Sequence, residues 1–302
     1  MTLLAIALVC VAAVLHAFWN LVGKRQSPSA AFFLVASVSG AAALLPLLVR
    51  DRHVLALVPP AVWVLVVVTG VFEALYYAAL AGAYRNGDMS VAYPLARALP
   101  VIMITVISAA LALGKPFSQA GLAGIVAVAA GCLIVPLRSL SRQHLSRGLA
   151  VVCLLAATAA IGTTGYTLID NEALRQMRAL GGTGLGTIEI TLVYLALGTL
   201  SSILWITPYI AFAAPERARL LSMTRPAALS AVAAGLVITL GYSMVLVAMA
   251  YASNVSYIAA FRQTSIPLGA ALGIIVEKEK PYPLKLLGVA VILGGLILVA
   301  VA

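Results

Sequence analysis

The 302-residue sequence is poor in charge. It has 9 acidic and 19 basic residues, so charged side chains make up 9% of the chain, against about 25% in soluble domains. So few charges cannot cover a water-facing surface, which argues against a soluble enzyme. The net charge of +10 comes from residues that stand singly or in pairs between apolar runs. Since a nucleic-acid binder gathers its basic residues in a patch or stripe, this spread argues against that class as well.

Histidine and cysteine are also scarce, with three of each. The three cysteines lie inside apolar stretches and lack the spacing of a zinc site or a disulfide framework, so we interpret them as small buried hydrophobes. Two of the histidines, His53 and His144, fall in predicted loops, and no acidic cluster lies within the apolar segments. An intramembrane enzyme would need clustered aspartates for magnesium, a HExxH zinc site or a Ser/His pair. We therefore expect no enzyme activity, no metal site and no cofactor.

What the sequence has in abundance is apolar residues, at 63% with a mean hydropathy of +1.11. A bilayer-spanning helix needs about 20 of them in a row. The first run starts at Thr2 without a preceding basic region and is too long for a signal peptide, so we expect a retained helix. The fold class predicted is all-α integral membrane, with ten transmembrane helices. The predicted segments are 2–23, 30–49, 60–84, 88–113, 118–137, 148–169, 185–212, 227–251, 254–276 and 283–301.

The second half of the chain resembles the first. A shift of 165 residues pairs Tyr77 with Tyr242 and Arg97 with Arg262. The first helix of each half aligns at a smaller shift, near 147, and we expect a loop over residues 170–184 to take up the difference. The predicted domains are residues 1–137, a first five-helix repeat, and residues 148–302, a second one, joined by a basic loop over residues 138–147.

An odd number of helices in each half makes the two halves enter the membrane from opposite sides. Inverted repeats of this kind are characteristic of secondary transporters, whose substrate site lies near the midplane between the repeats. The basic residues of the loops divide 5 to 12 between the two sides, with the smaller number on the side of the termini. The positive-inside rule then favours both termini outside.

Several short motifs stand in a fixed order along the chain. They are residues 15–20 (LHAFWN) with Lys24, residues 83–97 with Pro100, residues 111–116, residues 124–131, Pro267, residues 277–281 and residues 288–295. This ordered set resembles EamA-type members of the drug/metabolite transporter superfamily, and the resemblance covers nearly the whole chain and repeats in its second half.

The resemblance implies an exporter of a metabolite or an amino acid, in a multi-pass protein of the bacterial cytoplasmic membrane. Two positions depart from the family pattern. Lys115 stands where the family usually has glutamate, and the first helix has no acidic residue of the kind that small multidrug members use for proton coupling. That coupling mechanism is therefore not carried over to this chain.

Ionisable residues inside a membrane helix are costly and usually face the bundle interior. Glu73, Arg97 and Arg262 fall well inside predicted segments, and Glu189 lies nearer to an end. The two arginines are candidates for binding an anionic group of the substrate, or for structural pairing with carboxylates. For Glu73 three roles stay open, namely proton coupling, contact with a substrate ammonium group, and pairing with an arginine.

Aromatic and amide side chains complete the candidate substrate site. Trp19 is a candidate for ligand contact or for an anchor at the membrane interface. Tyr77, Tyr242 and Gln263 are further candidates for substrate binding, and the tyrosines also suit simple packing. Glycine runs such as those around Gly124 and Gly295 predict close helix packing.

The function predicted from these features is a secondary transporter, an exporter of a small metabolite such as an amino acid, that works by alternating access. A flippase for a lipid or lipid-linked molecule is the alternative on the same fold, and a channel would need a filter motif or rings of charge that are not seen. The partners expected are a small-molecule substrate and the lipid bilayer, with no nucleic acid; a homodimer stays open.

Overall fold

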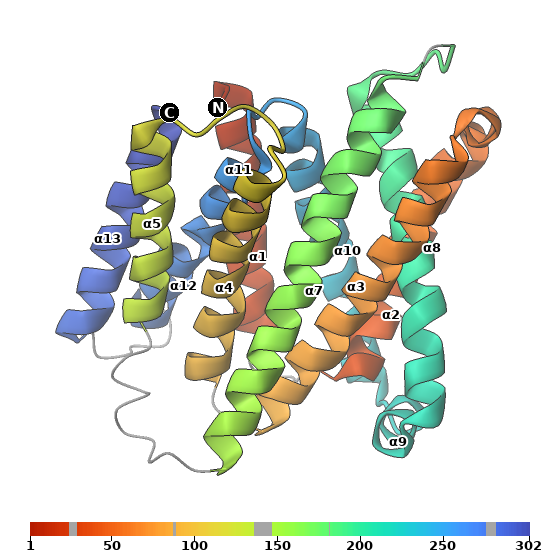
Figure 1. Cartoon of the computed structure of the whole chain (residues 1–302). Coiled ribbons are helices and arrows are strands. Elements are labelled where there is room, and N and C mark those ends of the chain that lie inside the picture. The colour runs from red at the N-terminus through yellow and green to blue at the C-terminus, as the bar shows by residue number, and fades with distance from the viewer. Residues whose placement is uncertain (24–28, 87–88, 136–146, 181, 276–281) are drawn as a thin grey trace.

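Helices account for all regular secondary structure in the residues that the structure, a computed structural model, describes: 1–23, 29–86, 89–135, 147–180, 182–275 and 282–302. Both chain termini lie at the same end of the helical bundle (Figure 1). We call this the termini end. The opposite end carries the short helix α9 (Ala214–Leu221) and is called the α9 end.

The helices follow the apolar runs of the sequence. Most of them begin and end within a few residues of a predicted segment. They are α1 (Leu3–Gly23), α2 (Ala30–Arg50), α3 (Pro60–Asn86), α4 (Met89–Ala110), α5 (Gln119–Ile134), α7 (Arg147–Arg178), α8 (Thr187–Phe212), α10 (Arg225–Met249), α11 (Val255–Phe261), α12 (Ser265–Ile275) and α13 (Pro283–Ala300), with 3-10 turns η1 (Arg52–Leu57) and η2 (Arg262–Thr264).

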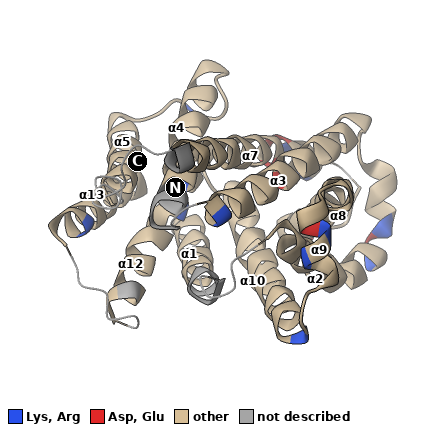
Figure 2. Cartoon of the chain, turned by 90° about the horizontal axis from the view of Figure 1, so that it is seen from below, with Lys and Arg blue, Asp and Glu red and all other residues tan. Residues whose placement is uncertain are grey.

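Among the described residues, six helices are long and apolar enough to cross a membrane: α2, α3, α7, α8, α10 and α13. Shorter apolar helices cover Leu3–Ala17, Leu95–Ala110 and Gln119–Ile134. The chain is thus a multi-pass integral membrane protein, and its ribbon carries few charged residues when it is viewed along the bundle (Figure 2). The count of ten spans stays a prediction.

Local chemistry sets where several helices start. The hydroxyl of Ser29 accepts the backbone N–H of Phe32 at the start of α2, and Asn254 accepts that of Ser256 at the start of α11. Both are helix caps that satisfy backbone donors left free in the first turn. Helices α9, α10 and α13 instead have proline in the first turn, where its missing N–H costs nothing.

One boundary was predicted wrongly. Residues 170–178 were expected to begin a loop, but α7 continues to Arg178 and is 32 residues long. The stretch has no glycine or proline, and Glu172 pairs with Arg175 one turn later at 2.6 Å. A hydropathy boundary stops at the first charge, whereas a helix continues as long as its residues favour it. Asp170 is therefore a helical residue inside the bundle.

The predicted segment 254–276 is not one helix. It consists of α11, the turn η2 and α12, so that Arg262 lies in the turn while Arg97 lies in the continuous helix α4. Pro267 has no N–H to offer the carbonyl of Gln263, which interrupts the helical ladder here. The backbone N–H of Ser265 is directed at the carbonyls of Arg262 and Gln263, and its hydroxyl donates to the carbonyl of Arg262 at 3.1 Å.

Packing joins helices that are far apart in the sequence. Helix α3 packs along α7 and α8, helix α10 packs along α1 and α2, and α5 lies beside α13 (Figure 1). The predicted close packing of the glycine runs is confirmed between α5 and α13. A Cβ on Gly124 would lie 2.7 Å from the carbonyl oxygen of Gly295, and one on Gly131 would lie 2.7 Å from that of Gly288. Only glycine allows these backbones to approach so closely.

Candidate functional site

A cavity lies in the bundle between α1, α2, α3, α4, α7, α8, α10 and η2. Both halves of the chain contribute to its wall, which combines charged, aromatic and small polar side chains. We call it the central cavity; its wall includes His16, Phe33, Ser37, Glu73, Tyr76, Tyr77, Arg97, Tyr166, Thr199, Ile238, Tyr242 and Arg262. Five of the side chains predicted for the substrate site are thus brought together, namely Glu73, Tyr77, Arg97, Tyr242 and Arg262.

Glu73 lies at the midpoint of α3 and is half-buried on the cavity wall. Pairing with an arginine was one of its three predicted roles. In the part of the chain that the structure describes, no ion pair joins Glu73 to an arginine. Glu73 lines the cavity wall, and its proton-coupling and substrate-ammonium roles stay predictions.

Arg97 is 8% exposed and is held by the second half of the chain. Its Nη2 donates to the carbonyl oxygen of Arg262 at 2.9 Å and to the hydroxyl of Ser265 at 3.0 Å. These bonds fix α4 against the broken helix η2–α12. Arg97 thus has a structural role in addition to its place on the cavity wall.

Arg262 is held more loosely than Arg97. Its guanidinium nitrogens approach the hydroxyls of Tyr166 and Thr167 at 3.4 and 3.5 Å, and its central carbon lies 5.7 Å from the centroid of the Tyr242 ring. The two hydrogen bonds are long, and arginine has five N–H donors. Arg262 is half-buried on the cavity wall, so it keeps donors for a ligand.

Aromatic rings form a continuous chain along the cavity wall. Phe33 stacks on Tyr77 at 4.7 Å between centroids, Tyr77 touches Tyr76 at 5.3 Å, and Tyr76 meets Tyr166 at 5.9 Å. Tyr166 then contacts Tyr242 at 5.7 Å. The rings come from α2, α3, α7 and α10, so they join the two halves of the chain. Such a wall suits a ligand with an apolar or flat part.

Asp170 is the residue that sequence reasoning missed. It is 2% exposed, and it accepts hydrogen bonds from the hydroxyls of Thr69, Tyr194 and Tyr242. Hydropathy predicts a loop at Asp170 because this residue ends an apolar run, whereas it lies inside α7. The available signal was helical spacing, since Asp170 lies four residues after Tyr166 and hence on the same helix face.

The remaining predicted residues lie away from the cavity or cannot be placed. Gln263 is 4% exposed, donates to the carbonyl of Ala259 at 3.0 Å, and is not part of the cavity wall. Glu189 accepts the backbone N–H of Gly186 at 2.9 Å and so stabilises the start of α8. Trp19 belongs to α1, but its side chain lies outside the described residues.

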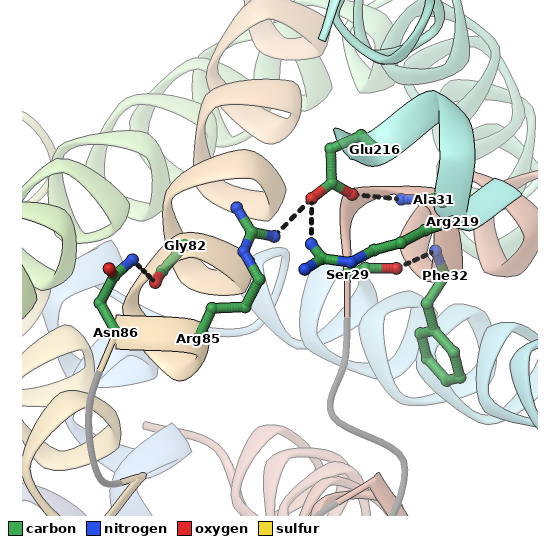
Figure 3. A network of polar contacts seen from close by, with 8 residues as sticks. All are labelled: Ser29, Ala31, Phe32, Gly82, Arg85, Asn86, Glu216 and Arg219. Carbon is green, nitrogen blue, oxygen red and sulfur yellow. Dashed lines mark hydrogen bonds and ion pairs between the residues drawn. The ribbon is translucent and has the colours of Figure 1, made fainter. Parts of the chain in front are cut away.

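A second charged cluster lies at the α9 end. Glu216 of α9 is 1% exposed and binds Arg85 at 2.5 Å, Arg219 at 2.8 Å and the backbone N–H of Ala31 at 3.2 Å (Figure 3). The carboxylate thereby joins α9 to the end of α3 and to the start of α2. We call Glu216, Arg85 and Arg219 the Glu216 cluster. The predicted segments leave Glu216 in a loop between residues 212 and 227, whereas it lies in the helix α9.

Comparison with known structures supports the fold. One solved structure, described only as "Crystal structure of protein", matches with a TM-score of 0.70 over 98% of this chain and 97% of that one. At 16% identity this likeness shows a shared fold alone. A comparison with curated protein sequences finds no match.

Residues 3–137 match the EamA-like transporter family. The matched region spans α1 to α5 and includes Glu73, Tyr77 and Arg97 of the cavity wall. This confirms the resemblance found in the sequence motifs. Residues 3–137 thus carry the sequence pattern of the EamA-like transporter family, which is part of the drug/metabolite transporter superfamily.

Proposed function

We propose that the protein is a secondary transporter that exports a small metabolite, such as an amino acid or a related compound, by alternating access. The observation that carries the proposal is the central cavity. It places an acidic and a basic side chain, Glu73 and Arg262, among aromatic rings inside a membrane bundle. A site with both charges and an apolar wall fits a small zwitterionic or amphipathic molecule.

Each wall residue has a distinct part in this proposal. Arg262 binds an anionic group of the cargo, since its guanidinium keeps N–H donors for the forked geometry that carboxylates and phosphates favour. Glu73 either binds an ammonium group or carries the coupled proton. Tyr77 and Tyr242 pack against the apolar part of the cargo. Trp19 and Gln263 stay candidates from the sequence alone.

Contacts between helices support the proposed inverted repeats. A Cβ on Gly70 of α3 would lie 2.1 Å from the hydroxyl oxygen of Ser201 in α8, and a Cβ on Gly235 of α10 would lie 2.1 Å from the carbonyl oxygen of Ala36 in α2. Gly70 plus 165 is Gly235, and Ser201 minus 165 is Ala36. The two crossings thus correspond when the halves are exchanged at the shift found in the sequence.

The crossing of α5 and α13 follows the same rule. Gly124 meets Gly295 and Gly131 meets Gly288, and a shift of 164 converts the first pair into the second. An approximate two-fold axis between residues 1–137 and residues 148–302 accounts for both sets of contacts. With five helices in each half, that axis lies in the membrane plane and passes near the central cavity. We place both termini outside a bacterial cytoplasmic membrane, following the loop charges.

The test begins with a ligand search on purified protein in detergent. Metabolites are screened for an increase in the unfolding temperature, because a ligand at one hundred times its Kd stabilises a native protein by about 2.7 kcal/mol. A hit is then followed in proteoliposomes with an imposed pH gradient. Wild type should transport it, Arg262→Lys should bind it more weakly, and Glu73→Gln should lose coupling to the gradient.

Glu172→Gln is the matched control, since Glu172 is a half-exposed carboxylate that pairs only within α7. It should transport normally. Full gradient-driven transport by Glu73→Gln would remove the proton-coupling role. Stabilisation by lipids or lipid-linked molecules, with none by soluble metabolites, would overturn the exporter proposal in favour of the flippase.

A further inference from the structure

Asp170 uses its two carboxylate oxygens differently. Its Oδ1 accepts the hydroxyls of Thr69 in α3 and Tyr194 in α8, at 2.5 and 2.6 Å. Its Oδ2 accepts the hydroxyl of Tyr242 in α10. Thr69 and Tyr194 are not part of the cavity wall, whereas Tyr242 is. One oxygen thus fastens packed helices, and the other holds a side chain of the proposed cargo site.

Tyr242 links Asp170 to Arg262. Its hydroxyl is bound to Asp170, and its ring lies 5.7 Å from the guanidinium carbon of Arg262. The ring is also in edge contact with Tyr166, at 5.7 Å and 88° between planes. A tyrosine whose hydroxyl is fixed and whose ring is packed has little freedom left in its two side-chain torsions. The hydrogen bond to Asp170 and the contact with Tyr166 therefore fix the position of the ring that Arg262 contacts.

The restraint matters because Arg262 has few others. Its side-chain hydrogen bonds to Tyr166 and Thr167 are 3.4 and 3.5 Å long, at the weak end of the range for N–H donors. A cation over an aromatic face gains more as it is desolvated, and Arg262 is half-buried. The ring of Tyr242 is thus a main determinant of where the guanidinium points.

We infer that Asp170 is a positioning residue of the cargo site, which holds Tyr242 so that its ring aims the guanidinium of Arg262 at the anionic group of the cargo. The inference rests on the proposed function for the assignment of Arg262 to the cargo. The arrangement of the three side chains is tested without any cargo. Asp170 itself touches no ligand in this arrangement.

The three hydroxyl donors of Asp170 provide a matched set of variants. Tyr242→Phe keeps the ring and removes only the hydroxyl that reaches Oδ2. Tyr194→Phe and Thr69→Val each remove one hydroxyl that reaches Oδ1. All three take one hydrogen bond from the same buried carboxylate, so they loosen the bundle to a similar degree. Only the first releases the ring that faces Arg262.

The experiment measures how fast phenylglyoxal modifies Arg262 in the full-length protein in detergent. Phenylglyoxal reacts with accessible guanidinium groups, and mass spectrometry of the peptide that contains Arg262 gives its rate. Arg50, with 62% of its side chain exposed, is the internal reference. Unfolding temperatures of all variants are recorded so that folded protein is compared with folded protein. Tyr242→Leu, which removes the ring as well, sets the upper limit of the effect.

We expect Tyr242→Phe to raise the modification rate of Arg262 about three- to tenfold, and Tyr242→Leu to raise it at least as much, because the ring no longer holds the guanidinium. Tyr194→Phe and Thr69→Val should leave the rate within about twofold of wild type while lowering the unfolding temperature. An unchanged rate in Tyr242→Phe would overturn the inference, and so would an equal increase in all three variants.

This result separates the inference from the proposed function. A selective increase in Tyr242→Phe with no cargo found by screening would leave the positioning role standing and the transport proposal without support. Where a cargo is found, its affinity should fall in Tyr242→Phe and stay near the wild-type value in Tyr194→Phe. Equal affinities in the two variants would show that the position of Arg262 does not matter for that cargo.

Discussion

Replacing Glu216 by glutamine tests whether the α9 end of the bundle is held by a buried charge. Glutamine keeps the shape of the side chain and an oxygen that accepts the backbone N–H of Ala31. It loses the negative charge that Arg85 and Arg219 share. Both arginines then face a neutral amide. The N–H donors of its NH2 group lie opposite the N–H donors of the arginines. The change therefore isolates the charged part of the Glu216 cluster.

The expected loss follows from burial. The side chain of Glu216 is 2% exposed, while those of Arg85 and Arg219 are 28% and 43% exposed. Removing one partner of a fully buried pair costs about 3–5 kcal/mol, and an exposed pair is worth about 0–1 kcal/mol. Since the arginines reach water and the carboxylate does not, we expect a loss of about 2 kcal/mol, close to that of one hydrogen bond to a charged group.

The control is Glu172→Gln, which removes a carboxylate from a pair with Arg175 whose side chains are 36% and 69% exposed. Its expected cost is below about 0.5 kcal/mol. Thermal unfolding in one detergent, followed by intrinsic fluorescence, compares the two variants with wild type at low and high salt. Glu216→Gln should unfold several degrees below Glu172→Gln under both conditions, because buried pairs are screened less than exposed ones.

Two outcomes would refute this reasoning. Equal unfolding temperatures for the two variants would mean that the burial of Glu216 does not increase the strength of its ion pairs. A double variant, Glu216→Gln with Arg85→Gln, should be no worse than the sum of the single losses, since the second change removes a donor that the first leaves unpaired. A double loss larger than that sum would place the stabilisation elsewhere.

Other positions give sharp expectations in the same assay. Gly235→Ala should destabilise the protein strongly, because a Cβ there would lie 2.1 Å from a backbone carbonyl oxygen, whereas Gly294→Ala, with nothing within 4 Å of the new atom, should be close to neutral. Arg97→Lys should cost about 1–3 kcal/mol of stability through its lost hydrogen bonds, while Arg262→Lys should leave the unfolding temperature nearly unchanged; equal losses would contradict the different roles assigned to them. Asn254→Ala should cost about 1–2 kcal/mol, since that side chain both caps α11 and donates to two loop carbonyls, and an unchanged unfolding temperature would show that water replaces these bonds.

Much of the helical framework could be predicted from the sequence, because an apolar run long enough for a bilayer forms a helix almost regardless of its neighbours. The prediction of helix boundaries failed at charged residues that follow an apolar run, because such a residue can begin a loop or can lie in a helix. Asp170 and Glu216 each follow an apolar stretch, and hydropathy treats such a charge as the start of a loop. Two of the partners that bury these carboxylates, Thr69 and Arg85, lie 101 and 131 residues away, so no local pattern could reveal these two.

The internal duplication predicted those residues of the candidate site that occur in both halves of the chain. The shift of 165 residues singled out Arg97 with Arg262 and Tyr77 with Tyr242, and all four line the central cavity. The duplication could not indicate how the members of a pair differ. Arg97 is committed to backbone and hydroxyl acceptors while Arg262 keeps free donors, because only the second half has the helix break at Pro267. The position that corresponds to Glu73 is Ile238, so the acidic side chain of the cavity wall belongs to one half only.

Helix α3 connects the cavity to both ends of the bundle. Thr69 and Arg85, about 24 Å apart along the helix, each bind a buried carboxylate of the second half, Asp170 and Glu216, and Glu73 lies between them. A bundle that alternates must release one of these ends at a time. Near Asp170 one hydrogen bond crosses between the halves, from Thr69, since Tyr194 and Tyr242 belong to the same half as Asp170. At the α9 end two contacts cross, from Arg85 and from the N–H of Ala31. At the termini end further hydrogen bonds join the halves, from the N–H of Lys115 to the carbonyl of Ser253 and from the amide of Asn254 to the carbonyls of Leu113 and Lys115. In the proposed transport cycle, opening either end therefore breaks polar contacts between the halves.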